Sequence, residues 1–185
     1  MDLIISKNKN IYLQHLRTEH AQALLDLRLR NHDYLQPFEP IRDPSYFTVE
    51  IQEKDILSGL GDIGEASSQL FGIFLSVTDE LIGRVALTGI ARGPFQNANL
   101  GYFIAQEQQG KGYMTEAVKL AARYAFNELG LHRIQAGVMP RNTPSQRVIE
   151  KVGFRCEGLA KRYLRINGVW EDHQLFAVTS EEWEK

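Results

Sequence analysis

The chain has 185 residues, the usual size of one domain. Hydrophobic residues make up 43% of it, enough for a sizeable core. Its 21 basic and 23 acidic residues give a formal net charge of −2, which disfavours a nucleic-acid partner because phosphate-backbone binding needs a cationic surface. The sequence shows neither an apolar run of membrane length nor an export signal, and it contains neither CxxC nor HExxH. We therefore expect a single cytoplasmic domain over residues 1–185 that binds no metal and does not associate with a membrane.

The first third of the chain predicts one strand and two helices. Residues 11–17 alternate apolar and polar side chains, as a half-buried strand does, and Thr18 is a suitable cap for a helix that follows. Three prolines within residues 35–44 predict an extended or turning segment. Thr48 is then expected to cap a second, short helix that reaches about Leu60.

The middle of the chain predicts three antiparallel strands and a long helix. Residues 61–68 break the second helix, and the three strands that follow are expected at 70–77, 81–90 and 97–105. A stripe of small apolar side chains predicts a helix that packs closely on the sheet and ends at Gly130. The stripe consists of Met114, Ala117, Val118, Ala121, Ala125 and Leu129.

The last third predicts a strand, a helix and a hairpin. The strand covers residues 132–139, and the helix covers residues 142–152 with Asn142 or Thr143 as its cap. Residues 154–179 are expected to form one long hairpin that turns at Asn167 and Gly168, since both residue types tolerate positive φ.

A glycine loop, "EQQGKGYMTEAV" (residues 107–118), separates the third strand of the middle region from its helix. Unpaired backbone N–H groups converge at such a helix start, and glycines let an anionic ligand approach the main chain, which predicts a phosphate site. Lys111 is followed by Gly112, which excludes GxxxxGK[ST], and Thr115 replaces the third glycine of GxGxxG. A tight glycine turn without a ligand is the alternative.

Two stretches resemble the signatures of the GNAT superfamily of acetyl-CoA-dependent N-acetyltransferases. Residues 109–114 resemble its Q/R-x-x-G-x-G/A loop, with Met114 at the usual Gly or Ala position, and residues 141–158 resemble its second signature. The predicted order of elements is also similar to the family's. The resemblance implies an α+β fold with a mixed, mostly antiparallel sheet that splays near its centre and carries helices on both faces.

The same resemblance implies the coenzyme contacts. Backbone amides of the loop would hold the pyrophosphate of acetyl-CoA, and Phe103 and Ile104 would pair with the pantetheine arm. Lys111 would lie beside the phosphates or in solvent, and Arg147 and Lys151 would meet the outer phosphate or form an exposed helix face. The loop residues are Gln109, which opens the turn, and Gly110, Gly112, Met114 and Thr115.

The chain most resembles the branch that acetylates the N-terminal alanine or serine of ribosomal proteins. That resemblance makes Ser145 the donor of a proton to the coenzyme thiolate and Asn142 a coenzyme contact, whereas capping of a helix would explain the same residues without catalysis. The general base stays open between a water molecule, Glu39 and the adjacent pair Asp172 and His173. For Glu39 the alternative is an anchor for its loop, and for the pair it is a buried polar contact.

Two other functions remain possible on the sequence alone. One keeps acetyl-CoA but uses a small amine, such as an amino acid, a polyamine or an aminoglycoside, as the acceptor. The other is a non-catalytic regulator that binds acyl-CoA, since the usual family glutamate falls near Asn99 and a carboxylate of some relatives falls at Leu164. The chain is expected to be a monomer or a homodimer.

Overall fold

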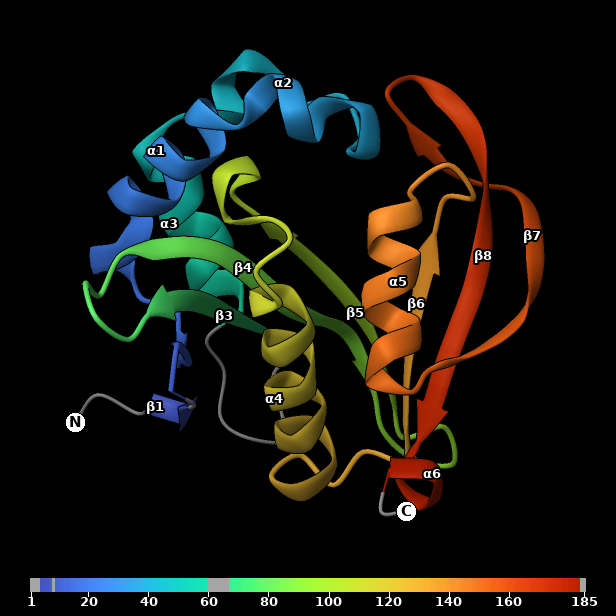
Figure 1. Cartoon of the computed structure of the whole chain (residues 1–185). Helices are drawn as coiled ribbons and strands as arrows, with labels where there is room; N and C mark the ends of the chain where they lie inside the picture. Colours follow the sequence, from blue (N-terminus) through green and yellow to red (C-terminus); the bar gives the residue numbers. More distant parts are fainter. Residues whose placement is uncertain (1–3, 8, 60–66, 184–185) are drawn as a thin grey trace.

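The computed structural model describes residues 4–7, 9–59 and 67–183, so most of the break predicted at 61–68 lies outside the described residues. Within these ranges, eight strands form one sheet in the order β1-β2-β3-β4-β5-β6-β8-β7 (Figure 1). The strands are β1 (Ile4–Lys7), β2 (Ile11–His15), β3 (Ser68–Leu75), β4 (Leu81–Ala91), β5 (Asn97–Ile104), β6 (Arg133–Val138), β7 (Arg155–Ile166) and β8 (Val169–Thr179).

The described part of the chain also contains six α-helices and four short 3₁₀ helices, of which α6 follows the last strand and the others lie between strands. The α-helices are α1 (Ala21–Arg30), α2 (His32–Leu35), α3 (Val49–Ser58), α4 (Tyr113–Asn127), α5 (Thr143–Val152) and α6 (Ser180–Trp183). The 3₁₀ helices are η1 (Thr18–His20), η2 (Gln36–Phe38), η3 (Pro44–Tyr46) and η4 (Gln106–Gln108). No helix among the described residues is both long and apolar enough to cross a membrane.

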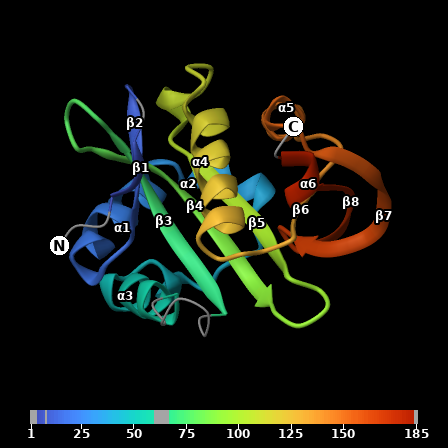
Figure 2. The same cartoon turned by 90° about the horizontal axis from the view of Figure 1, so that it is seen from below.

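The sheet opens between β5 and β6, the one parallel pair of neighbours among the strands that the structure describes. These strands are paired only at Asn97 with Arg133, Ala98 with Ile134 and Asn99 with Gln135. Beyond Asn99, β5 continues beside β4, whereas β6 continues beside β8. The two parts of the sheet therefore diverge, as Figures 1 and 2 show, which confirms the mixed, splayed sheet expected from the sequence.

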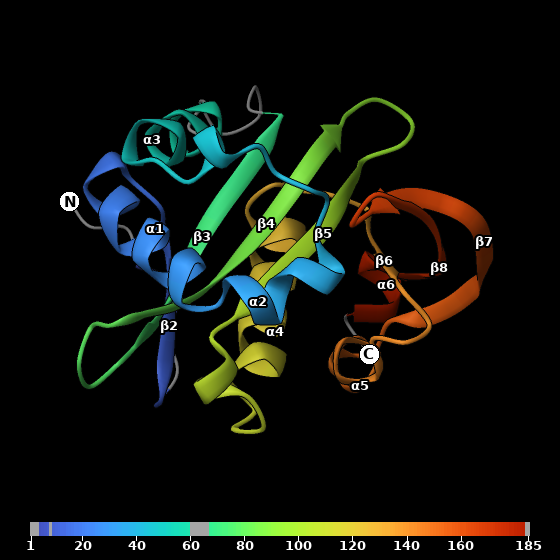
Figure 3. The same cartoon turned by 90° about the horizontal axis from the view of Figure 1, so that it is seen from above.

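Helices cover both faces of the sheet, and the alternation of side chains along β2 explains how. Ile11 and Leu13 point into the core beneath α4 and α5, while Tyr12 points into the core shared with α1 and α3. In Figure 3, α1 and α3 lie on one side of β3 to β5 and α4 on the other. Each residue of the predicted apolar stripe of α4 is buried.

Local details at the N-terminal end differ from the expectation. The strand β1 was not predicted, because four residues are too few to show a period. Thr18 is not the helix cap: the chain first forms η1, and the N–H of Arg17 donates to Nδ1 of His20 at 3.0 Å. The cap at Thr48 is confirmed, since its Oγ1 accepts from the N–H of Ile51, although α3 ends at Ser58.

Candidate active site

The opening between β5 and β6 contains a cavity of about 830 Å³. Its walls are residues 100–104 of β5, residues 136–138 of β6, the glycine loop with the first turn of α4, and one face of α5. Tyr34, Phe38 and Glu39 close it from the side of α2 and η2. Sequence segments more than a hundred residues apart therefore meet around one space that is large enough for an extended cofactor.

The glycine loop enters this cavity with the geometry that anion binding requires. Gly110 and Gly112 have φ values of 72° and 81°, and a Cβ atom on either would meet no other atom within 4 Å. Gly112 directly precedes α4, whose first N–H groups have no partner within the helix. Met114 is buried, so at this family position the side chain fills the core and the main chain remains available.

The polar side chains of the loop take different directions. The Gln109 amide donates a hydrogen bond to the Tyr34 hydroxyl and so connects the loop to α2. Lys111 donates to Oε1 of Gln108 at 2.8 Å and is not among the residues that line the cavity. The side chain of Lys111 is thus directed along the loop surface.

The end of β5 supplies the wall that the sequence analysis assigned to the pantetheine arm. Phe103 and Ile104 both line the cavity. Among the described strands, β5 pairs only with β4 beyond Asn99. Its edge toward β6 is therefore open to an extended ligand, as in the addition of a strand to a sheet edge.

Helix α5 brings Asn142 and Ser145 to the opposite wall. Asn142 is the N-cap of the helix, and its Oδ1 accepts from the N–H of Ser145 at 3.3 Å, which confirms the predicted cap. Ser145 lines the cavity, and its Oγ lies 2.8 Å from the hydroxyl oxygen of Tyr102 on β5. Arg147 and Lys151, both exposed, lie farther along α5 and also border the cavity.

Tyr102 is a site residue that the sequence analysis did not identify. It immediately precedes Phe103, which the resemblance had already placed beside the coenzyme, so its position was the available signal. Burial raises the pKa of Tyr102 well above the ordinary value, and the hydrogen bond with Ser145 offsets this only in part. Its hydroxyl therefore keeps its proton at neutral pH.

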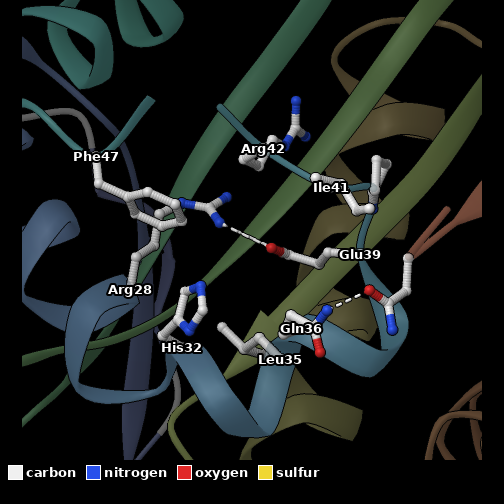
Figure 4. Close-up of a pocket in the computed structure, with 10 residues that line it drawn as sticks. Arg28, His32, Leu35, Gln36, Glu39, Ile41, Arg42 and Phe47 are labelled. Carbon is white, nitrogen blue, oxygen red and sulfur yellow. Dashed lines mark hydrogen bonds and ion pairs between the residues drawn. The ribbon is translucent and has the colours of Figure 1, made fainter. Parts of the chain in front are cut away.

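A second, smaller cavity of about 260 Å³ adjoins the first (Figure 4). It is enclosed by residues of α1, α2 and the proline-rich segment, and Leu35 and Glu39 line both cavities. Arg28 reaches from α1 toward Glu39, and its Nη1 lies 3.3 Å from each carboxylate oxygen. The boundary between the two cavities is therefore formed by a carboxylate in an ion pair.

Arg28 is almost fully buried, with 2% of its side chain exposed, while Glu39 is 26% exposed. The guanidinium carbon of Arg28 lies 4.7 Å from the ring centre of Phe103, and that of Arg84 lies 5.5 Å from the same ring. Burial, and next to it the charge of Arg28, lower the pKa of Arg84 to about 10. Glu39 thus neutralises part of the positive charge that Arg28 and Arg84 bring together.

The predicted pair of Asp172 and His173 is not a pair in the structure. The Asp172 carboxylate accepts from the N–H of Arg162 in a bulge of β7, and His173 is buried with its Nδ1 3.0 Å from the carbonyl oxygen of Glu171. Consecutive residues on a strand point to opposite faces, which separates the two side chains. Only His173 lines the larger cavity.

At Asn99 and Leu164, the two positions where family members can carry a carboxylate, this chain has residues that cannot act as a base. Asn99 donates to the carbonyl oxygen of Thr88 and accepts from the Gln135 amide, and Leu164 is 45% exposed on β7. Trp170 is 60% exposed and lines neither cavity. Within the described ranges, no group of three or more His, Cys, Asp or Glu side chains is arranged to hold a metal ion.

A sheet that splays between two parallel strands, with a glycine loop on one wall and Ser145 of α5 on the other, agrees with the acetyltransferase architecture that the sequence resemblance implied. The chain belongs to the GNAT acetyltransferase family: the family model described as "Acetyltransferase (GNAT) domain" matches residues 10–155. The protein is therefore an enzyme of the N-acetyltransferase class, as the sequence resemblance implied.

Similar proteins are found among bacterial acetyltransferases. The chain is 47% identical over 179 residues to the probable N-acetyltransferase YjcK of Bacillus subtilis (strain 168), covering 97% of this chain and 99% of that one. It is 39% identical to the ribosomal protein uS5-alanine N-acetyltransferase of Escherichia coli (strain K12), with coverage of 88% and 84%. The structure of Mycobacterium smegmatis RimJ in complex with CoA-disulfide superposes with a TM-score of 0.88 at 33% sequence identity. The superposition covers 95% of this chain and 84% of that one.

Proposed function

We propose that the protein transfers the acetyl group of acetyl-CoA directly to the free N-terminal α-amine of a protein that begins with alanine or serine, as a cytoplasmic enzyme. The observation that carries this proposal is the larger cavity, which joins the glycine loop, the open edge of β5 and Ser145. The uS5-alanine acetyltransferase among the relatives supports a protein N-terminus, such as that of a ribosomal protein, as acceptor.

The coenzyme is proposed to lie along the larger cavity, and the CoA-bound RimJ structure supports this assignment. The amides around Gly110 and Gly112 and in the first turn of α4, including those of Met114 and Thr115, would bind the pyrophosphate. Phe103 and Ile104 would pair with the pantetheine arm, Asn142 would contact it, and Arg147 would face the outer phosphate. Lys111, whose ammonium group donates to Gln108, would add positive charge near the phosphates without binding them directly.

The acceptor is proposed to enter through the smaller cavity and to meet the thioester beside Glu39. Attack by the amine on the thioester carbon breaks the C–S bond, and the sulfur takes the electron pair. Ser145 then supplies a proton to the thiolate. Because an α-amine with a pKa of about 7.7–8.0 is roughly a tenth neutral at pH 7, a water molecule suffices to carry away the proton of the amine.

In this proposal Glu39 fixes the segment beside which the acceptor lies, and it does not remove a proton from the amine. Its two oxygens face a buried guanidinium, and its backbone oxygen accepts from the N–H of Asn167 at 3.0 Å. A carboxylate held in this way anchors the segment that separates the two cavities, which agrees with the anchor alternative considered from the sequence.

The test is a thiol-release assay with acetyl-CoA and a panel of acceptors. The panel contains peptides with free alanine, serine or methionine N-termini, N-terminally blocked lysine peptides, an amino acid, a polyamine and an aminoglycoside. Turnover confined to free alanine and serine termini is expected. Turnover with small amines alone would reassign the acceptor, and silence across the panel despite tight acetyl-CoA binding would favour a regulator.

A further inference from the structure

One hydrogen bond crosses the cavity from the β5 wall to the α5 wall. Tyr102 lies three positions beyond Asn99, the last residue of β5 that pairs with β6, and there its hydroxyl oxygen is 2.8 Å from Oγ of Ser145. The backbone oxygen of Ser145, which can only accept, lies 3.1 Å from the same hydroxyl and is the second acceptor within reach of the Tyr102 proton. Both residues line the larger cavity, so the contact lies where the strands have already separated.

The direction of this hydrogen bond decides where the serine proton points. Each hydroxyl has one proton and can accept with its lone pairs. If Ser145 donated to Tyr102, its proton would be held against the β5 wall and would be unavailable to a ligand. If Tyr102 donates to Oγ, the Ser145 proton is free to point into the cavity, and the shorter of the two Tyr102 contacts is the one to Oγ.

We propose that Tyr102 is a positioning residue, which donates its hydrogen bond to Oγ of Ser145 and directs the serine proton at the departing sulfur. As the C–S bond breaks, the sulfur takes the electron pair and receives the proton from Oγ. The negative charge that gathers on Oγ is stabilised by the Tyr102 hydroxyl, because hydrogen bonds to charged oxygens are stronger than neutral ones. Oγ regains a proton from solvent, to which the attacking amine has released its own. This inference rests on the proposed role of Ser145.

The surroundings of Tyr102 keep it a donor. Burial raises its pKa well above the ordinary value, so the phenolate form is disfavoured throughout the working range of pH. The hydroxyl therefore holds its own proton while stabilising the charge on Oγ.

The test is a double-mutant cycle of Tyr102→Phe and Ser145→Ala, measured as kcat and KM with the best peptide of the panel. We expect Tyr102→Phe to lower kcat by about 10- to 100-fold, the usual effect of losing a hydrogen bond to a charged group, with KM for acetyl-CoA changed less than about twofold. In the Ser145→Ala background the same substitution should have no further effect on kcat. Tyr124→Phe is the matched control, since its hydroxyl contacts His15 and lies outside both cavities.

The cycle separates this inference from the proposed function. Normal turnover of Tyr102→Phe beside an impaired Ser145→Ala variant would overturn the role of Tyr102 and leave the acetyltransferase proposal intact. Equal losses in both backgrounds, or a parallel rise in KM for acetyl-CoA, would show a purely structural role and would also overturn it. An active Ser145→Ala variant would remove Ser145 as donor and the inference with it.

Discussion

Gly112 combines a φ value of 81° with open space where a side chain would stand, at the start of α4. Gly112→Val places a branched side chain against the proposed phosphate site. We expect acetyl-CoA affinity to fall at least about tenfold, because the main chain can no longer approach an anion. Calorimetric titration with acetyl-CoA measures this change.

The control for that variant is Gly130→Val. Gly130 also has a positive φ, 60°, and no atom near its missing Cβ, but it does not line the larger cavity. It should lose stability without losing acetyl-CoA affinity. Wild-type affinity in Gly112→Val, or the same loss in both variants, would contradict the assignment of the loop.

Glu39 gives the second test at the level of single residues. Glu39→Gln leaves the buried Arg28 with a neutral partner, so the free energy of unfolding should fall by about 1–3 kcal/mol. Because Glu39 is assigned to positioning, KM for the peptide should rise while kcat stays within a few-fold. Urea unfolding and steady-state kinetics measure both quantities.

The exposed turn residue Glu80, changed to Gln, is the control for Glu39 and should match the wild type in both measurements. A fall of kcat by about 10²–10⁴ in Glu39→Gln, with KM unchanged, is the result of removing a general base. That outcome would restore Glu39 to the chemical step and contradict the anchoring role.

How far single residues were predictable depends on the range of their contacts. The cap at Asn142, one of the two candidates from the sequence, depends on a contact only three residues along the chain and was predicted. The bond of Tyr102 to Ser145 spans 43 residues and depends on how the sheet opens, so no local pattern reveals it. Asp172 and His173 are neighbours in sequence and were therefore considered as one pair. On a strand, consecutive side chains point to opposite faces, so the two side chains have different partners.

At the level of elements, the hairpin of β7 and β8 does more than complete the sheet. Its turn residues Asn167 and Gly168 have φ values of 45° and 80°, which confirms the turn expected from this residue pair. The turn reaches the proline-rich segment, where the N–H of Asn167 donates to the backbone oxygen of Glu39. The C-terminal hairpin thus helps to fix the wall between the two cavities.

Gly168→Ala tests this contact. A Cβ atom on Gly168 would lie 3.2 Å from Cδ1 of Ile41, and the positive φ adds strain, so we expect the free energy of unfolding to fall by about 1–2 kcal/mol. The shifted turn should also raise KM for the peptide several-fold and leave acetyl-CoA affinity unchanged. Gly93→Ala, with a φ of 67° and no atom near the missing Cβ, controls for strain alone. An unchanged KM in Gly168→Ala would mean that the hairpin does not shape the acceptor site.

Elements with long periodic patterns were predicted well, and short ones were not. The apolar stripe that begins at Met114 follows nearly the whole of the 15-residue helix α4 and identified both the helix and its buried face. The strand β1 and the helix α6 have four residues each, too few for a period to be visible. The start of α1 was misplaced because a 3₁₀ turn, stabilised by His20, precedes it.

At the scale of the whole molecule, the divergence of β5 and β6 is the property on which the function depends. Hydrophobic patterning predicts that each strand is buried, but not where two neighbours stop pairing, so the splay was expected only from the family resemblance. Once β5 leaves β6 after Asn99, the glycine loop and Ser145, from distant parts of the chain, face the same space. The net charge of −2 agrees with local, backbone-based anion binding at a helix start.

The central claim is that this cavity delivers an acetyl group to a free α-amine. The most direct measurement is mass spectrometry of a mixture of peptides that start with alanine, serine or methionine and each contain one lysine, after incubation with acetyl-CoA and the protein. Fragmentation should locate a single acetyl group on the first residue of the alanine and serine peptides, and the product should nearly disappear with Ser145→Ala. Acetylation of the lysine side chains, or none on any peptide, would contradict the account.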